Sequence, residues 1–328
     1  MTTFYTSVER YGNNILHRGY ENGQRFSYRV PFEPTLYIHT PKAGAEGYQS
    51  LTEGGLPVSP TKFGDMREAK TFIEEYKGVH GMKIFGSTNY VTQFIQQEYP
   101  NKITYDVSQV NIVSFDIEVD IRDGYPNMDT ADKEITSIAY HSSREDIYYV
   151  LGRKDYDKTK TVTDIPQDKI KFVLFDGING ESALLQYFMK LWTTDYPDVV
   201  TGWNVEYFDM QYIVTRIIRL LGEETAKRLS PHKSIRQTSR EIFGKMAYTY
   251  SVMGVAIIDY MDCFKKFGYK YGPQESYKLD HIAYVVLGET KIDYSEYGSL
   301  TALYDENPQL YLDYNLKDTQ LIARLEEE

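Results

Sequence analysis

The chain has 328 residues, a formal net charge of −11 and a composition that is 41% hydrophobic and 25% charged. This length allows two domains and a sizeable core, whereas the acidic balance argues against a protein that holds duplex DNA by charge alone. A single cysteine, Cys263, excludes a disulfide framework and a cysteine-based zinc site, and no segment reaches the ~18 apolar residues of a membrane helix.

Residues 1–104 are expected to form a small mixed α/β domain. Alternating apolar residues predict strands at 4–12, 15–32 and 34–40, and amphipathic stretches predict helices at 65–81 and 89–99. The Asn22-Gly23 pair has the chemistry of a tight hairpin turn, and Asp65 fits a helix N-cap. The polar stretch that begins at Pro100 marks the most suitable domain boundary.

Residues 105–328 predict an open mixed sheet covered by helices, which places the chain in the α/β (α+β) class. Strands are expected at 110–119, 134–143, 146–152, 198–204 and 255–262, and helices at 181–192, 209–222, 278–288 and 311–328. A β-hairpin is expected near 234–255, with Gly244 at its turn.

The stretch SFDIEVD, residues 114–120, places acids on a strand that otherwise looks buried. Strand side chains alternate between faces, so Asp116, Glu118 and Asp120 share one side. Like charges this close repel one another and raise the pKa of the carboxyl groups. The pattern fits a solvated strand edge, but it also fits a site for a divalent cation, which would remove the repulsion.

Two later stretches carry further acids at the ends of predicted elements. TGWNVEYFDMQYI places Asp209 at the start of an amphipathic helix, where the helix dipole alone would favour it. YLDYNLKDTQLIARL places Tyr314 and Asp318 four residues apart on one helix face. Together with Asp116 and Glu118 these acids predict a site for two Mg²⁺ ions about 4 Å apart, as in phosphoryl transfer, and Mn²⁺ accepts the same ligands.

FDIEVD, TGWNVEYFDMQYI and YNLKD resemble the three exonuclease motifs of family B DNA polymerases, above all those of T-even-type bacteriophages. The resemblance covers nearly the whole chain, and it implies a ribonuclease H-like 3′–5′ exonuclease domain behind a polymerase N-terminal domain. It also implies roles for five residues. The metal-binding acids would be Asp116, Glu118, Asp209 and Asp318, and Tyr314 would orient the attacking water. Asp313 stands where a second subtype of these nucleases has histidine, so the tyrosine subtype fits.

The same resemblance implies contacts with DNA. Asn204 and Phe208 match residues that contact the 3′ end of the single strand, and Tyr125 matches an aromatic residue that packs against frayed bases. The hairpin that contains Phe243 and Lys245 resembles the element that separates the primer end from its template. Read without the resemblance, Tyr125 fits a turn residue before a proline, and Asn204 fits a loop hydrogen-bonder.

We therefore expect a proofreading exonuclease that removes nucleotides from single-stranded or frayed DNA at a primer–template, in the cytoplasm of an infected host cell. No stretch resembles the polymerase palm, fingers or thumb, so we expect no polymerase activity from this chain by itself. A polymerase half would act in cis or in trans, depending on whether the chain is a truncation or a split-gene product. The alternative is a non-catalytic half that assembles with a separate polymerase subunit or binds RNA as a regulator.

Overall fold

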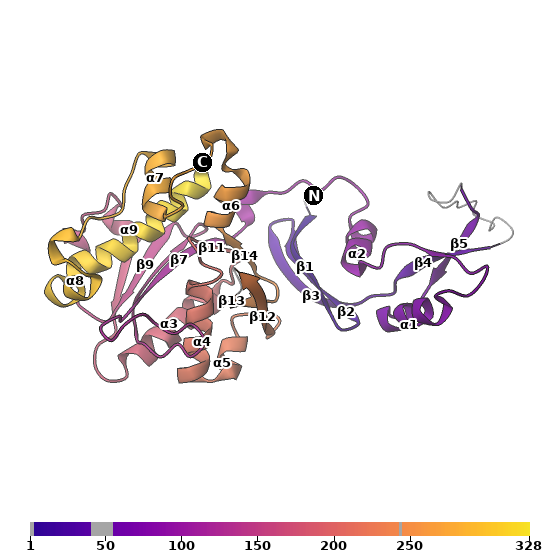
Figure 1. Ribbon diagram of the computed structural model, residues 1–328, viewed down its shortest axis with the longest axis horizontal. Coiled ribbons are helices and arrows are strands. Elements are labelled where there is room, and N and C mark those ends of the chain that lie inside the picture. The colour runs from indigo at the N-terminus through magenta and orange to yellow at the C-terminus, as the bar shows by residue number, and fades with distance from the viewer. Residues whose placement is uncertain (1–2, 41–54, 243–244) are drawn as a thin grey trace. The chain divides into compact units, whose positions relative to one another are not determined.

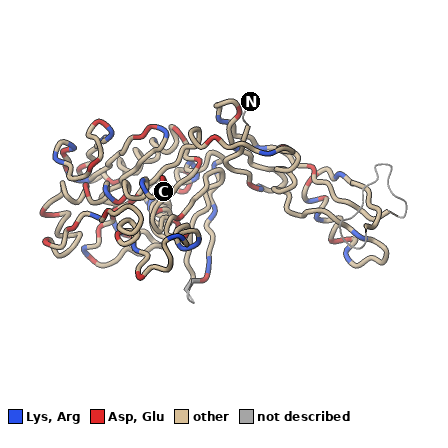
Figure 2. Tube along the Cα trace, turned by 90° about the horizontal axis from the view of Figure 1, so that it is seen from above, with Lys and Arg blue, Asp and Glu red and all other residues tan. Residues whose placement is uncertain are grey.

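A computed structural model describes residues 3–40, 55–242 and 245–328 (Figure 1). The chain divides into two compact units, Met1–Asp106 and Val107–Glu328, which are taken one at a time below. In the coloured parts of Figure 2, basic and acidic residues are interspersed within both units. Among the described residues, no helix has the length and apolar character needed to span a bilayer.

The first unit contains two small antiparallel sheets and two helices. One sheet has the order β1-β2-β3, and the other has the order β5-β4-β6. Their bounds are β1 Thr3–Tyr11, β2 Asn14–Glu21, β3 Gln24–Pro31, β4 Thr35–His39, β5 Val58–Lys62, β6 Ile84–Phe85, α1 Met66–Tyr76 and α2 Tyr90–Glu98. Asn22 and Gly23 both have positive φ angles, of 50° and 81°, which is the backbone that a tight hairpin requires. Asp65 caps α1 by accepting bonds from two backbone N–H groups of the first turn.

The second unit is built on a six-stranded mixed sheet with the order β10-β9-β8-β7-β11-β14. Its strands are β7 Ile112–Val119, β8 Ile135–Ser142, β9 Ile147–Gly152, β10 Ile170–Leu174, β11 Val199–Gly202 and β14 Ala256–Asp259. The central strand β7 runs antiparallel to β8 and parallel to β11. This sheet, its flanking helices and the sheets of the first unit confirm the predicted α/β (α+β) fold class.

Helices cover both faces of this sheet, as Figure 1 shows. Helices α3 (Gly180–Thr194), α4 (Asp209–Leu221) and α5 (Glu223–Lys227) lie on one side; α6 (Tyr260–Phe267), α7 (Leu279–Leu287), α8 (Leu300–Glu306) and α9 (Pro308–Glu327) lie on the other. Alternate residues of β7, among them Phe115 and Ile117, are buried in the apolar core shared with α3 and α4. The intervening residues of β7 therefore face α9, and two of them are acids.

Two details differ from the sequence prediction. The short strand β10 was not predicted; it follows two turns of 3₁₀ helix and pairs in parallel with β9. The strand expected over 255–262 ends at Asp259, because the carboxylate of this residue accepts a bond from Met261 N and starts α6.

The expected hairpin region contains β12 (Ile235–Ile242) and β13 (Lys245–Val252), which pair in antiparallel fashion. Phe243 and Gly244 lie outside the described residues, so the prediction for Phe243 has no structural counterpart here.

Candidate active site

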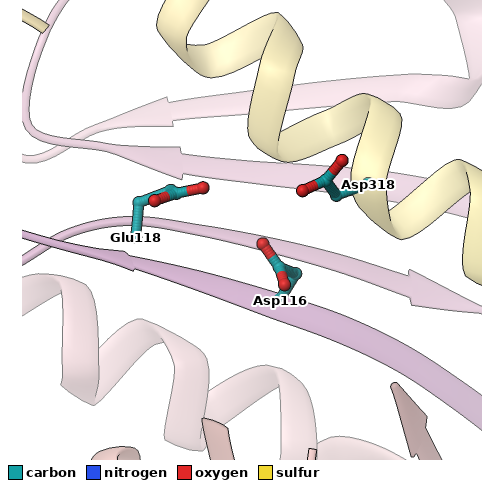
Figure 3. Close-up of side chains that lie close together, drawn as sticks. All are labelled: Asp116, Glu118 and Asp318. Carbon is teal, nitrogen blue, oxygen red and sulfur yellow. The ribbon is translucent and has the colours of Figure 1, made fainter. Parts of the chain in front are cut away.

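Three acids meet between the centre of the sheet and helix α9. Asp116 and Glu118 project from β7, and Asp318 projects from α9 toward them (Figure 3). One carboxylate oxygen of each residue lies within 4.8 Å of those of the other two. The two-residue period of the strand and the placement of one helix across it are enough to bring together groups that are far apart in sequence.

Helix α9 is fixed at its start and along its length. Pro308 occupies the first turn, and the Asn307 side chain caps the helix by accepting a bond from Leu310 N. Farther along, the buried carboxylate of Asp313 accepts bonds from the hydroxyls of Tyr156 (2.7 Å) and Thr161 (2.6 Å). Asp313 therefore ties α9 to the loop before β10 and does not join the group of three acids.

Burial dominates the electrostatics of the three acids. Burial and the neighbouring Asp318 raise the pKa of Asp116 to about 7. Burial, together with Asp116 and Asp318, raises the pKa of Glu118 well above its ordinary value. Burial also raises the pKa of Asp318 to about 6, although Lys291 opposes this shift. Without a bound cation, the folded state is therefore destabilised when all three carboxyl groups are charged.

Lys291 belongs to the same cluster, and sequence reasoning missed it. Its Nζ donates to Asp318 Oδ2 at 2.5 Å and to the hydroxyl of Tyr314 at 3.1 Å. Burial lowers the pKa of Lys291, but Asp318, Tyr314 and Asp116 together outweigh burial, so the pKa lies above its ordinary value. Lys291 lies in the loop after α7, where no periodicity indicates which way a side chain points.

Asp209 reaches the same strand by a different contact. It begins α4, and its Oδ1 accepts a bond from Ile117 N at 3.1 Å. This bond is available because β11 pairs with β7 only as far as Ser114. Burial and the nearby Asp116 raise the pKa of Asp209 well above its ordinary value. Asp209 is thus coupled to the acids of β7 but lies outside the group of three.

Asp120 is separated from these acids. A register shift between Glu118 and Val119 interrupts the alternation of β7. Beyond it, the Asp120 carboxylate accepts bonds from Arg122 N at 3.0 Å and from the Arg122 guanidinium at 3.4 Å. The strand face shared by Asp116 and Glu118 therefore ends before Asp120.

The acidic group fits a divalent cation. Asp318 is only 3% exposed, and its Oδ1 has no hydrogen-bond partner among the described residues. Buried oxygens without partners are costly and uncommon in folded proteins. A donor set made of carboxylates matches the hard cations Mg²⁺ and Mn²⁺. A cation there would satisfy the free oxygen and offset the repulsion among the acids.

With this geometry in hand, the chain can be compared with known proteins. Residues 87–282 match the family model for the exonuclease domain of DNA polymerase family B. The chain belongs to DNA polymerase family B. This confirms the resemblance drawn from the exonuclease motifs, and it assigns the mixed sheet to the ribonuclease H-like exonuclease domain of that family.

Several DNA polymerases are similar to this family B chain. The DNA-directed DNA polymerase of Escherichia phage RB69 is 30% identical over 342 residues, which cover 99% of this chain and 37% of the phage protein. That of Enterobacteria phage T4 is 29% identical with the same coverage. DNA polymerase II of Escherichia coli (strain K12) is 24% identical over 65% of this chain and 24% of its own length. The family B chain thus spans about 37% of the length of the two phage relatives.

The residues expected to contact DNA lie in different settings in this family B chain. Tyr125 is 93% exposed. Asn204 has a φ of 63° in the loop after β11, and its N–H donates to Asp259 at 3.1 Å. Phe208 is half-buried and packs against the apolar core, where its ring stacks on Tyr212. The side chain of Lys245 lies outside the described part of the structure.

Proposed function

We propose that this chain is the metal-dependent 3′–5′ exonuclease portion of a phage-type DNA polymerase, and that it hydrolyses the 3′-terminal phosphodiester of single-stranded or frayed DNA. One observation carries the proposal. The carboxylates of Asp116, Glu118 and Asp318 converge to within 4.8 Å, and a buried oxygen of Asp318 is left without a partner among the described residues.

The acids would hold the cations. Asp116, Glu118 and Asp318 are the proposed ligands, with Asp209 as a further one; Mg²⁺ is the proposed ion and Mn²⁺ a substitute. When bound, two such ions activate water and stabilise the leaving oxygen of a phosphoryl transfer. The chain itself then has to place the water and the terminal phosphodiester.

Tyr314 is the proposed residue that orients the water. Burial and the nearby Asp318 raise the pKa of Tyr314 above its ordinary value, so the phenol stays protonated at neutral pH. Lys291 donates to the phenol oxygen, which leaves the phenol proton available to another acceptor. Tyr314 therefore acts as a hydrogen-bond donor and not as a general base, and Lys291 adds positive charge beside Asp318.

The substrate would be held by stacking and by local polar contacts. An acidic chain gains little from overall attraction to nucleic acid, whereas stacking of bases on aromatic rings is tolerant of sequence. The exposed ring of Tyr125 suits frayed bases, and Asn204 and Phe208 flank the loop that leads to Asp209. Phe243 and Lys245 are proposed contacts at the hairpin.

The proposed setting is a replication complex in the cytoplasm of an infected host cell. The partners would be a primer–template and the polymerase portion that the longer phage relatives contain. Whether that portion acts in cis or in trans, the proposed exonuclease site lies entirely within the second unit.

A 5′-labelled single-stranded oligonucleotide tests the proposal. With Mg²⁺, we expect a ladder that shortens from the 3′ end, and EDTA should abolish it. Asp116→Ala should reduce the rate by about 10³-fold or more, while Asp120→Ala is the matched control, because Asp120 lies on the same segment but pairs with Arg122. A ladder that persists in Asp116→Ala would overturn the assignment. An intact oligonucleotide with folded wild-type protein would favour the non-catalytic binding role.

A further inference from the structure

The side chain of Asn315 lies between helix α9 and the acids of β7. It is fully buried, with 0% exposure. Its Nδ2 donates to Asp116 Oδ2 at 2.7 Å and to the main-chain oxygen of Asp116 at 3.2 Å. Its Oδ1 accepts a bond from the hydroxyl of Ser137 at 2.7 Å. Both polar atoms of this side-chain amide therefore form hydrogen bonds to β7 and β8, the two central strands of the sheet.

The orientation of the amide follows from these partners. A main-chain carbonyl oxygen can only accept, so the atom that faces Asp116 O must be the NH₂ group. The amide oxygen is then directed to Ser137, whose hydroxyl can donate. Ser137 lies on β8 directly opposite Glu118 in the strand register. Two hydrogen bonds through the Asn315 amide on α9 thus link Ser137 on β8 to the carboxylate oxygen Oδ2 of Asp116 on β7.

We propose that Asn315, supported by Ser137, is a positioning residue that fixes the Asp116 carboxylate in the orientation that binds the divalent cation. This inference rests on the proposed metal site. A carboxylate of a two-bond side chain rotates freely unless it is held, and a metal site requires its ligands at defined distances and angles. Asn315 holds Oδ2 of Asp116, so the orientation of the whole carboxylate, and with it the direction of Oδ1, depends on this bond.

Partners of metal ligands typically change metal affinity by about 10- to 100-fold when they are removed. Asn315→Leu keeps a side chain of similar size but removes both bonds to Asp116, so we expect the Kd for Mn²⁺ to rise by about 10-fold or more. Ser137→Ala leaves the amide in place without its support, and a smaller rise of the same sign is expected.

The chain offers a matched control on the same helix. Thr319 lies one turn after Asn315 and is equally buried, and its hydroxyl donates to the main-chain oxygens of Ala139 on β8 (3.4 Å) and of Asn315 in the preceding turn (3.3 Å). Thr319→Val therefore removes a buried polar contact between α9 and β8 without touching an acid. A general loosening of the helix would appear in this variant, whereas loss of positioning would not.

The test is a titration of the whole chain with Mn²⁺, without DNA, in which the free ion is measured by electron paramagnetic resonance. Thermal unfolding in EDTA reports on the fold. Exonuclease rates measured over a range of Mg²⁺ concentrations give a second readout. In Asn315→Leu, half-saturation should move to higher Mg²⁺ by the same factor as the Kd, and the rate at saturation should largely recover.

Each outcome decides between the alternatives. An unchanged Mn²⁺ affinity in folded Asn315→Leu would overturn the positioning role, and so would a loss of Mn²⁺ affinity in Thr319→Val equal to that in Asn315→Leu. Either result would leave the proposed exonuclease intact. If Asn315→Leu fails to fold, Ser137→Ala decides by the same criterion. If wild type and Asp116→Ala bind Mn²⁺ equally, the metal site itself is wrong, and the inference falls with the proposed function.

Discussion

The ammonium group of Lys291 lies 2.5 Å from Oδ2 of Asp318, so a cation from the chain already occupies one side of the acidic group. The other oxygen of Asp318 has no hydrogen-bond partner among the described residues. One oxygen of this carboxylate thus lies against a fixed positive charge, whereas the other makes no hydrogen bond to the described residues. Burial raises the pKa of Asp318, and the charge and hydrogen bond of Lys291 limit this rise, so that the pKa is about 6.

Lys291→Met should therefore slow the proposed hydrolysis, because it changes the pH at which Asp318 becomes charged. Removal of the ammonium removes the group that opposes the effect of burial, so the pKa of Asp318 should rise further. A higher pKa of a carboxyl group means that it becomes charged only at higher pH. The pH–rate profile should shift to more alkaline pH, and the rate at pH 7 should fall by about 10-fold or more.

Lys291→Arg is the control for this prediction, because it keeps the charge and can still donate to Asp318. It should retain the pH profile of wild type better than Lys291→Met does. Identical pH profiles in wild type and Lys291→Met would show that Lys291 does not set the charge of Asp318.

Without metal, the protein should become less stable as pH rises. Burial raises the pKa of Asp116 to about 7 and that of Asp318 to about 6, from ordinary values of 3.8. Between about pH 4 and pH 7 the folded state holds protons that the unfolded state has lost, so stability is greatest at low pH and falls across this window. In EDTA, the Tm should decline from pH 5 to pH 8.

Asp116→Asn provides the test of this pH dependence. The amide removes one buried charge, so the variant should melt several degrees higher than wild type in EDTA at pH 8. Added Mn²⁺ should raise the Tm of wild type, because the ion binds only the folded state, and should raise that of Asp116→Asn much less. A Tm for wild type that rises with pH in EDTA would contradict the assigned electrostatics.

Asp259 should control the loop that carries Asn204. Its carboxylate accepts bonds from the N–H groups of Asn204 (3.1 Å), Glu206 (3.4 Å) and Met261 (3.0 Å). Asp259→Ala loses the cap of α6 and the support of this loop, and should cost about 1–2 kcal/mol in the free energy of unfolding. It should also weaken binding of single-stranded DNA.

Ser299→Ala is the matched control for Asp259→Ala. Ser299 caps α8 by accepting a bond from Ala302 N, in a part of the chain that is remote in sequence from the loop after β11. Both variants should lose similar stability, but only Asp259→Ala should bind a single-stranded oligonucleotide more weakly in a fluorescence anisotropy titration. Equal affinities would show that the loop does not contact DNA.

Tyr125 should contribute to DNA binding and not to stability. Its side chain is 93% exposed, so Tyr125→Ala should leave the Tm unchanged. If the ring stacks on a frayed base, its removal should cost about 1–3 kcal/mol of binding free energy. Tyr269→Ala removes another tyrosine, 84% exposed, and should leave affinity unchanged. Equal Kd values for the two variants, measured on a frayed primer–template, would exclude a stacking role for Tyr125.

Sequence reasoning located the acids of β7 well, because strand alternation depends only on local geometry. Asp116 and Glu118 share a face as expected, whereas the register shift after Glu118 separates Asp120 from them. The positions of Tyr314 and Asp318 followed from helical spacing and the family motif. The catalytic roles of these residues stay predictions.

The remaining features depend on tertiary contacts. Lys291 lies in a loop whose path is set by the packing of α7 against α9, so nothing in its neighbours indicated its position at the acids. The bonds of Asn315 depend on the rotation of α9 against β7 and β8. Strand β10 was missed because five residues after a turn carry too little pattern to separate a strand from a loop.

Helix α9 also determines when the site can exist during synthesis of the chain. Asn315 lies 199 residues after Asp116, and Asp318 and Tyr314 belong to the same helix. A nascent chain from which only β7 has emerged still lacks Asp318, so the proposed metal site would form only after α9 emerges from the ribosome and docks on the sheet. A chain that ended before Pro308 would keep Asp116 and Glu118 on β7 but lack Tyr314 and Asp318.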